Sequence, residues 1–274
     1  MQTRSDSVED ALARAVVYHT LAVAFEPPTD ATLRAIGARD GFPVVIEALR
    51  LLLDDGRPKP DATTDDVRGV RLQAHLRSLK VADVESLASD YWRLFGHTTR
   101  GLVCACETEY GPDNGFHQPQ QLADIAGYYL AFGLRPSEDG EVRPDHIACE
   151  CEFLDCLSRK QARLFDGDGD DETREATAAA ERSFVRDHLG RVGRAFAARV
   201  AAEDRDGFYG AIGRVLLAFV DAECARLGVE SGAIDLIVRP EEIDDTPMAC
   251  GSADNGESVP LPLYRRDPPI GGHP

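Results

Sequence analysis

Apolar residues recur every three to four positions along most of this chain. The first such run lies between Ser7 and Phe25; serine is a residue type that caps helix N-termini, and Pro27 follows the run as a helix breaker. The same spacing predicts further helices over residues 30–38, 43–53, 64–79, 83–95, 118–132, 144–165, 172–202 and 206–227. No alternating strand pattern of useful length occurs. The chain is therefore predicted to be all-α, a single-domain bundle of roughly 8–10 helices.

Glycine, proline and polar residues divide this helical pattern. Residues 96–116 form a predicted loop, and a loop of that length inside a domain is usually functional or mobile. Gly190 and Gly193 are expected to kink the helix that contains them. Late in the chain the composition shifts to Pro, Gly and Asp. We therefore expect a helical domain over residues 7–228 and an irregular C-terminal extension over residues 229–274.

Acidic residues outnumber basic ones, with 48 Asp and Glu against 30 Lys and Arg, which gives a formal net charge of −18. This balance argues against nucleic acid as a partner, because phosphate binding needs a basic surface, and it suits a cationic partner. No apolar run of about 18 residues occurs, so no stable membrane insertion is expected. The N-terminus has no secretory pattern and the seven cysteines are an odd number, which together predict a cytoplasmic protein with reduced thiols.

The segment Arg143–Leu154 carries the most informative polar residues. It is predicted to open a helix, with a proline in its first turn and an aspartate behind it. At helical spacing His146, Glu150, Phe153 and Leu157 share one face. Polar groups beside a core face are costly unless something pairs with them. The partner is then another side chain, a metal or a bound peptide.

Two Cys-x-Cys pairs raise the metal alternative. Cys104 with Cys106 and Cys149 with Cys151 supply four thiols, enough for zinc or an iron–sulfur cluster. Structural zinc sites prefer a wider spacing, and within a helix Cys149 and Cys151 point about 200° apart. Cys104 and Cys106 lie in the predicted loop and are freer. A thiol-ligated metal protein is therefore kept as an alternative, and no metal is expected.

Catalysis is a weaker alternative. His146 and Glu150 could serve a helical hydrolase, but the chain has no nucleophile elbow, phosphate loop or dinucleotide fingerprint. The acidic run at residues 166–170 is not an EF-hand, because positions six and twelve are Asp171 and Thr177 in place of Gly and Glu.

Four blocks in order carry a family resemblance: Asp90–Phe95 (Asp-Tyr-Trp-Arg-Leu-Phe), Glu107–Gly111, Gln121–Leu134 and Arg143–Leu154. Their order and spacing resemble the TorD/DmsD/NarJ family of redox-enzyme maturation chaperones. The resemblance implies a TorD-like helical fold in a cytoplasmic chaperone that has no catalytic activity and no cofactor of its own. Both a monomer and a domain-swapped dimer are compatible with it.

The resemblance also implies the partner. It is the catalytic subunit of a molybdenum oxidoreductase of the dimethyl-sulfoxide-reductase class, bound through its twin-arginine signal peptide, its apo-form or both. The chaperone would support cofactor insertion before export. A twin-arginine peptide is cationic and then apolar, which suits an acidic protein with an apolar stripe.

Carried onto this chain, the resemblance assigns peptide-binding roles. An apolar wall would meet the peptide's hydrophobic part, a polar rim would end the groove, and a loop containing Glu109 would close over it. Glu150 would support His146 or meet a client arginine. The assigned residues are Tyr91, Leu94, Phe95, Glu107, Tyr110, Asp145, His146 and Glu150.

Overall fold

The computed structural model describes residues 7–37, 41–53, 84–97, 101–111, 117–136, 142–239 and 264–266. The described helices are α1 (Val8–Phe25), α2 (Asp30–Gly37), α3 (Gly41–Leu53), α5 (Val84–Phe95), α6 (His117–Ala131), α7 (Ile147–Phe165), α8 (Asp171–Asp187), α9 (Leu189–Glu203) and α10 (Phe208–Leu227). A 3-10 turn, η1 (Glu107–Glu109), and two short strands, β1 (Leu134–Pro136) and β2 (Tyr264–Arg266), complete the set. The predicted all-α class is confirmed. The helix predicted over residues 64–79 lies outside the described residues.

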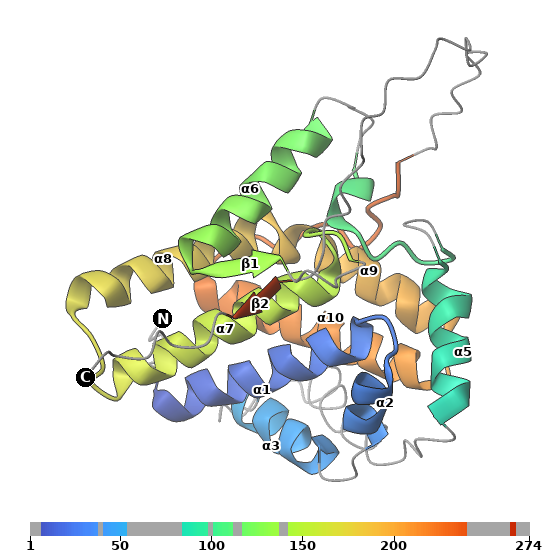
Figure 1. The fold of residues 1–274 in the computed structure, drawn as a ribbon, viewed down its shortest axis with the longest axis horizontal. Coiled ribbons are helices and arrows are strands. Elements are labelled where there is room, and N and C mark those ends of the chain that lie inside the picture. Colours follow the sequence, from blue (N-terminus) through green and yellow to red (C-terminus); the bar gives the residue numbers. More distant parts are fainter. Residues whose placement is uncertain are drawn as a thin grey trace, which may run out of the picture.

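Two helix pairs form the centre of the bundle (Figure 1). Helix α1 packs along α7, and α10 packs along α9. Helices α2 and α3 lie against α1, and α8 joins the two pairs by contacting α7, α9 and α10. Ser7 caps α1 as predicted, because its hydroxyl accepts the Asp10 N–H at 3.1 Å. This arrangement buries the apolar stripes that the sequence pattern identified.

Aromatic side chains fill the end of the core nearest α5. The rings of Phe25, Phe95 and Phe196 contact one another, with centroids 5.0 to 6.1 Å apart. Tyr91 and Tyr209 extend the cluster, and the Tyr91 hydroxyl donates to the carbonyl of Phe25 at 3.2 Å. Edge-on and stacked aromatic contacts of this kind add to the free energy gained by burying the rings. The C-terminal half of α5 is therefore fixed in the core.

A buried ionic cluster ties α1 to α7, α8 and α10. Arg14, which is fully buried, donates to Gln161 at 3.2 Å and lies 3.9 Å from the Glu181 carboxylate. Arg226 bridges Glu181 and Glu223, with 2.7 Å hydrogen bonds to both. Such pairs offset the cost of removing each charge from water only because every partner is present.

The helix predicted over residues 172–202 is two helices, which corrects the expectation of a glycine kink. The break is at His188, whose backbone angles (φ −122°, ψ −100°) are not helical. Gly190 follows the break, and a Cβ there would lie 2.3 Å from the Val185 carbonyl oxygen. Glycine is thus needed for the close approach of α9 to α8, whereas the break itself belongs to histidine.

The first part of the C-terminal extension packs against the bundle. Gly228 ends α10 in the left-handed conformation (φ +60°), as glycine commonly does at a helix C-terminus. Residues 229–239 have no helix or named strand, yet they hydrogen-bond to α9 and to the segment that contains η1. Further along, β2 pairs antiparallel with β1, with Arg135 opposite Arg265.

Candidate functional site

The segment Gly101–Gly111 lies against the chain that leads into α7. The Glu107 N–H donates to the Asp145 carbonyl at 2.8 Å, and the Ile147 N–H donates to the Ala105 carbonyl at 2.9 Å. Two backbone bonds thus pair residues 105–107, which lead into η1, antiparallel with residues 145–147 at the start of the helix. Eight of the eleven residues in this segment are buried. The part of the predicted loop that the structure describes is therefore packed and not free.

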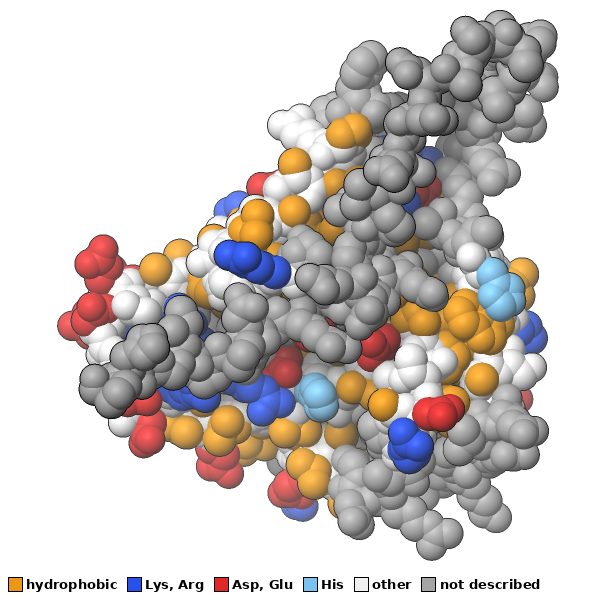
Figure 2. Space-filling view, viewed as in Figure 1, with side chains coloured by type: hydrophobic (Ala, Val, Ile, Leu, Met, Phe, Trp, Pro, Cys, Tyr) orange, Lys and Arg blue, Asp and Glu red, His pale blue; other side chains and the backbone are white. Residues whose placement is uncertain are grey.

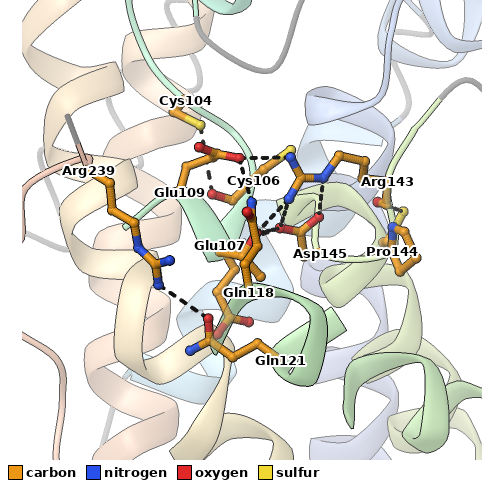
Figure 3. A network of polar contacts seen from close by, with 12 residues as sticks. Cys104, Cys106, Glu107, Glu109, Gln118, Gln121, Arg143, Pro144, Asp145 and Arg239 are labelled. Atoms are coloured by element: carbon orange, nitrogen blue, oxygen red, sulfur yellow. Dashed lines mark hydrogen bonds and ion pairs between the residues drawn. The ribbon is translucent and has the colours of Figure 1, made fainter. Parts of the chain in front are cut away.

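Asp145 is the centre of the polar network at this junction (Figure 3). Its fully buried carboxylate accepts the N–H and the hydroxyl of Thr108, at 3.0 and 2.7 Å. Arg143 donates to both carboxylate oxygens at 3.0 Å and to Glu109 at 2.8 Å. Gln118 of α6 joins by donating to Thr108 and Glu109. The network holds η1, α6 and the start of α7 in one arrangement.

Helix α7 begins later than predicted. Pro144 and Asp145 precede it, and the N-cap is His146, whose Nδ1 accepts the Ala148 N–H at 3.2 Å. The cap uses a histidine because Asp145 is already committed to Arg143 and to η1. Burial, assisted by the nearby Arg143 charge, lowers the pKa of His146 to about 4. At neutral pH His146 is thus an uncharged acceptor.

A second set of polar contacts joins η1 to the break between α8 and α9. Glu107 meets His188 Nδ1 at 3.0 Å and accepts a short hydrogen bond from Arg191. Burial opposes ionisation of Glu107, but the histidine and the arginine outweigh it and lower its pKa. The other ring nitrogen of His188 lies 3.4 Å from the Asp124 carboxylate of α6. Glu107 is therefore an ionised carboxylate held by two partners.

Glu150 completes this cluster and is its least satisfied member. It is fully buried, and neither carboxylate oxygen receives a hydrogen bond from a donor within the described part of the chain. Burial raises its pKa well above the usual range, and the negative charge of Glu107 raises it further. As a neutral acid, Glu150 can donate to the Glu107 carboxylate. The two carboxyl groups thus share a site as one ionised and one protonated partner.

The cysteines do not gather into a metal site in the described residues, where no group of three or more His, Cys, Asp or Glu side chains has a suitable arrangement. Cys104 and Cys106, which the sequence placed in a free loop, are buried, and this corrects that expectation. Burial raises the pKa of Cys104 to about 11 and also raises the pKa values of Cys149 and Cys151. Metal ligands and nucleophiles are thiolates, and these thiols stay protonated at neutral pH.

The apolar residues assigned to the groove are core residues in this structure. Tyr91, Leu94 and Phe95 are at most 5% exposed, and the Leu94 carbonyl accepts the Val103 N–H at 2.9 Å. Tyr110 is also buried, and its hydroxyl donates to the Cys104 carbonyl at 2.7 Å. The eight assigned residues thus lie in the core or in the polar junction that borders it. Their role in peptide binding stays a prediction.

Sequence reasoning missed several residues of the junction, among them Arg143, His188 and Arg191. Arg143 was visible beside Pro144 and Asp145, and its position next to a buried acid was the available signal. His188 and Arg191 follow the motif by about forty residues along the chain, and no spacing rule links them to Glu107.

Acidic, basic and hydrophobic side chains are interspersed on the face shown in Figure 2. Large hydrophobic side chains in the described residues that stay exposed are Leu12, Val44, Leu102, Leu130, Ile234 and Ile237. Among the described helices, none combines the length and hydropathy that a membrane crossing requires.

Comparisons with known proteins give the class of this all-helical protein. A family model described as nitrate reductase delta subunit matches residues 60–198, just over half of the chain. Chaperone protein TorD of Photobacterium profundum is 29% identical over 152 residues, a match that covers 56% of this chain and 68% of that protein. No solved structure matches the chain.

The chain belongs to the nitrate reductase delta subunit family, the TorD/NarJ family of chaperones that its motifs resemble. It is a chaperone of molybdoenzyme maturation, which acts with a molybdoenzyme catalytic subunit, and it is not an enzyme.

Proposed function

We propose that this chaperone binds the twin-arginine signal peptide of its client, together with the apo-form of the catalytic subunit, and supports cofactor insertion before export. The client would be a molybdenum oxidoreductase of the dimethyl-sulfoxide-reductase class, and binding would take place in the cytoplasm. The observation that carries the proposal is the excess of carboxyl groups at the junction of η1 and α7. Glu107, Glu109, Asp145 and Glu150 gather there around two arginines, Arg143 and Arg191.

Guanidinium groups are the natural partners of such carboxylates, because they form paired, charge-assisted hydrogen bonds. In the described arrangement the chain's own arginines occupy Glu107, Glu109 and Asp145. A client arginine would compete for these acids and would give Glu150, which receives no donor, a cationic partner. Because the assigned residues are buried, this state requires the segment Gly101–Gly111 to separate from the start of α7.

Isothermal titration calorimetry with a synthetic twin-arginine peptide tests the proposal. We expect a dissociation constant near micromolar, roughly −8 kcal/mol, at low salt. A peptide with both arginines replaced by lysine is the control, and it should bind more weakly because an ammonium cannot pair in the bidentate manner. Absence of binding at both low and high salt would overturn the proposal.

Glu150→Gln separates a contact role from a structural one. It removes the group that a client arginine would ionise while it keeps the shape of the side chain. Weaker binding of the arginine peptide by a fully folded Glu150→Gln protein would favour direct contact. Unchanged binding would exclude Glu150 from the peptide site.

A further inference from the structure

Residues 229–239, here called the strap, cross α9 in close contact. The Gly232 N–H donates to the Gly190 carbonyl at 2.8 Å, and Arg194 donates to the Gly232 carbonyl at 2.9 Å. A Cβ at position 232 would lie 1.8 Å from the Arg191 carbonyl oxygen. The strap backbone therefore approaches α9 too closely for any side chain at that point, and the contact depends on glycine.

The end of the strap pairs with the segment that carries η1. Val238 lies opposite Tyr110 in an antiparallel bridge. Two backbone hydrogen bonds flank this pair, from Gly111 N–H to the Ile237 carbonyl at 3.0 Å and from Arg239 N–H to the Glu109 carbonyl at 2.7 Å. The backbone of Glu109–Gly111, here called the docking edge, is thus occupied as it would be by an added strand.

The residues of the strap indicate what kind of segment fits the docking edge. Leu236 and Val238 pack against the core, whereas Ile237 between them is 63% exposed, an alternation typical of an extended strand. Arg239 follows, and its guanidinium reaches Gln121 of α6 at 3.4 Å (Figure 3). The occupant is therefore an extended aliphatic segment followed by an arginine, whose backbone N–H bonds to Glu109 and whose guanidinium bonds to Gln121.

We propose that the docking edge receives an extended, aliphatic and arginine-bearing segment of the client, and that the strap occupies it in the free chaperone. The inference rests on the proposed function, since the twin-arginine peptide supplies that chemistry. Main-chain pairing tolerates many sequences, so the client need not copy the strap. At the docking edge the strap is held by one bridge with two backbone hydrogen bonds and by the Arg239–Gln121 contact, and its release would also free the segment that covers the carboxylates.

Full-length variants test the closure at two separate points. Arg239→Pro removes the N–H that bonds to Glu109, and Arg239→Ala is its matched control, because it loses the guanidinium but keeps the N–H. Gly232→Ala detaches the strap at α9 without changing the docking edge. If Arg239→Pro fails to fold, Gly232→Ala still gives the result.

Two probes are titrated into each protein by calorimetry: the twin-arginine peptide and a synthetic peptide of residues 232–240. Because the competing strap loses one backbone hydrogen bond, both peptides should bind Arg239→Pro about fivefold more tightly than they bind Arg239→Ala. Both peptides should also bind Gly232→Ala more tightly than the wild type. Hydrogen exchange of the Gly111 amide, read by NMR, should become faster in Arg239→Pro and Gly232→Ala when no peptide is present.

The outcomes separate the two proposals. If the Gly111 amide exchanges faster but both peptides bind every protein alike, the docking edge is not the peptide site and this inference is overturned, while the proposed function stands. If only the strap peptide binds more tightly and the twin-arginine peptide binds no variant, the docking edge is supported and the proposed function fails. If neither peptide binds any variant, both are overturned.

Discussion

Replacing Glu150 by glutamine should stabilise this protein at neutral pH. The carboxyl group is fully buried, receives no donor in the described structure and lies beside the ionised Glu107. Burial and that neighbouring charge raise its pKa in the folded state, whereas in the unfolded chain it returns to about 4.5. Glutamine has a similar shape and an N–H that can donate to Glu107 as the protonated acid does.

The size of the effect follows from proton linkage. Below the unfolded pKa both states hold the proton, so Glu150 costs nothing in stability. Above it the unfolded chain releases the proton and the folded chain keeps it, so stability falls as pH rises. The loss is about 1.4 kcal/mol for each pH unit, until the raised folded pKa is reached. Glu150→Gln removes this loss, so its advantage over the wild type should grow by the same amount per unit.

Urea unfolding between pH 4.5 and 8, followed by the fluorescence of the single tryptophan, Trp92, measures this difference. Groups that do not interact with Glu150 titrate alike in both proteins and cancel in the comparison, whereas the titration of Glu107, which shares the site, is part of the measured difference. Glu152→Gln, an exposed substitution on the same helix, is the control and should show no such trend. A Glu150→Gln advantage that does not change with pH would refute the reasoning.

Two further substitutions and one alkylation reaction test the described contacts. Asp145→Asn should lower the free energy of unfolding by about 3 kcal/mol in urea melts, because it breaks a buried pair; a loss below about 1 kcal/mol would contradict the network. Leu94→Ala should lower the free energy of unfolding by about 2–5 kcal/mol because of the cavity it leaves, whereas Leu130→Ala, at a 59% exposed position, should lower it by less than about 0.5 kcal/mol. Equal losses would argue against the placement of Leu94 in the core. Burial raises the pKa of Cys104 to about 11, so this thiol should react with iodoacetamide at pH 8 about a hundredfold more slowly than an ordinary thiol. Mass spectrometry measures the rate with the half-buried Cys156 as internal reference, and a Cys104 rate at or above that of Cys156 would contradict the burial.

Periodicity predicted the helices well because each one buries a stripe of apolar residues. The stripe in α5 is an example, since Leu87, Tyr91, Leu94 and Phe95 are all buried. The missed helix break had no such signal. His188 leaves the helical conformation where its ring meets Glu107, and a partner 81 positions away is invisible to local spacing.

The predicted site shows the same division between local and distant effects. Helical spacing placed His146 and Glu150 on one face above the core, and both are buried there. Residues 101–111 were predicted to lie in a loop because the stretch is polar and rich in glycine, and apart from η1 they form no regular helix or strand. The loop is nevertheless packed, because its polar groups pair with Arg143 and Asp145 from another part of the chain. Composition indicates which environment a side chain prefers, whereas the fold determines which partner the side chain contacts.

The strap also has a consequence for how the protein is made. Gly111 and Ile237 are bonded to each other but lie more than a hundred residues apart in the chain. A ribosome therefore completes every described helix before the partner of Gly111 emerges. Closing so long a loop costs more entropy than any local contact, so this bond should form late in folding. The newborn chaperone would thus present its docking edge open, and would close it only after residues 229–239 have left the ribosome.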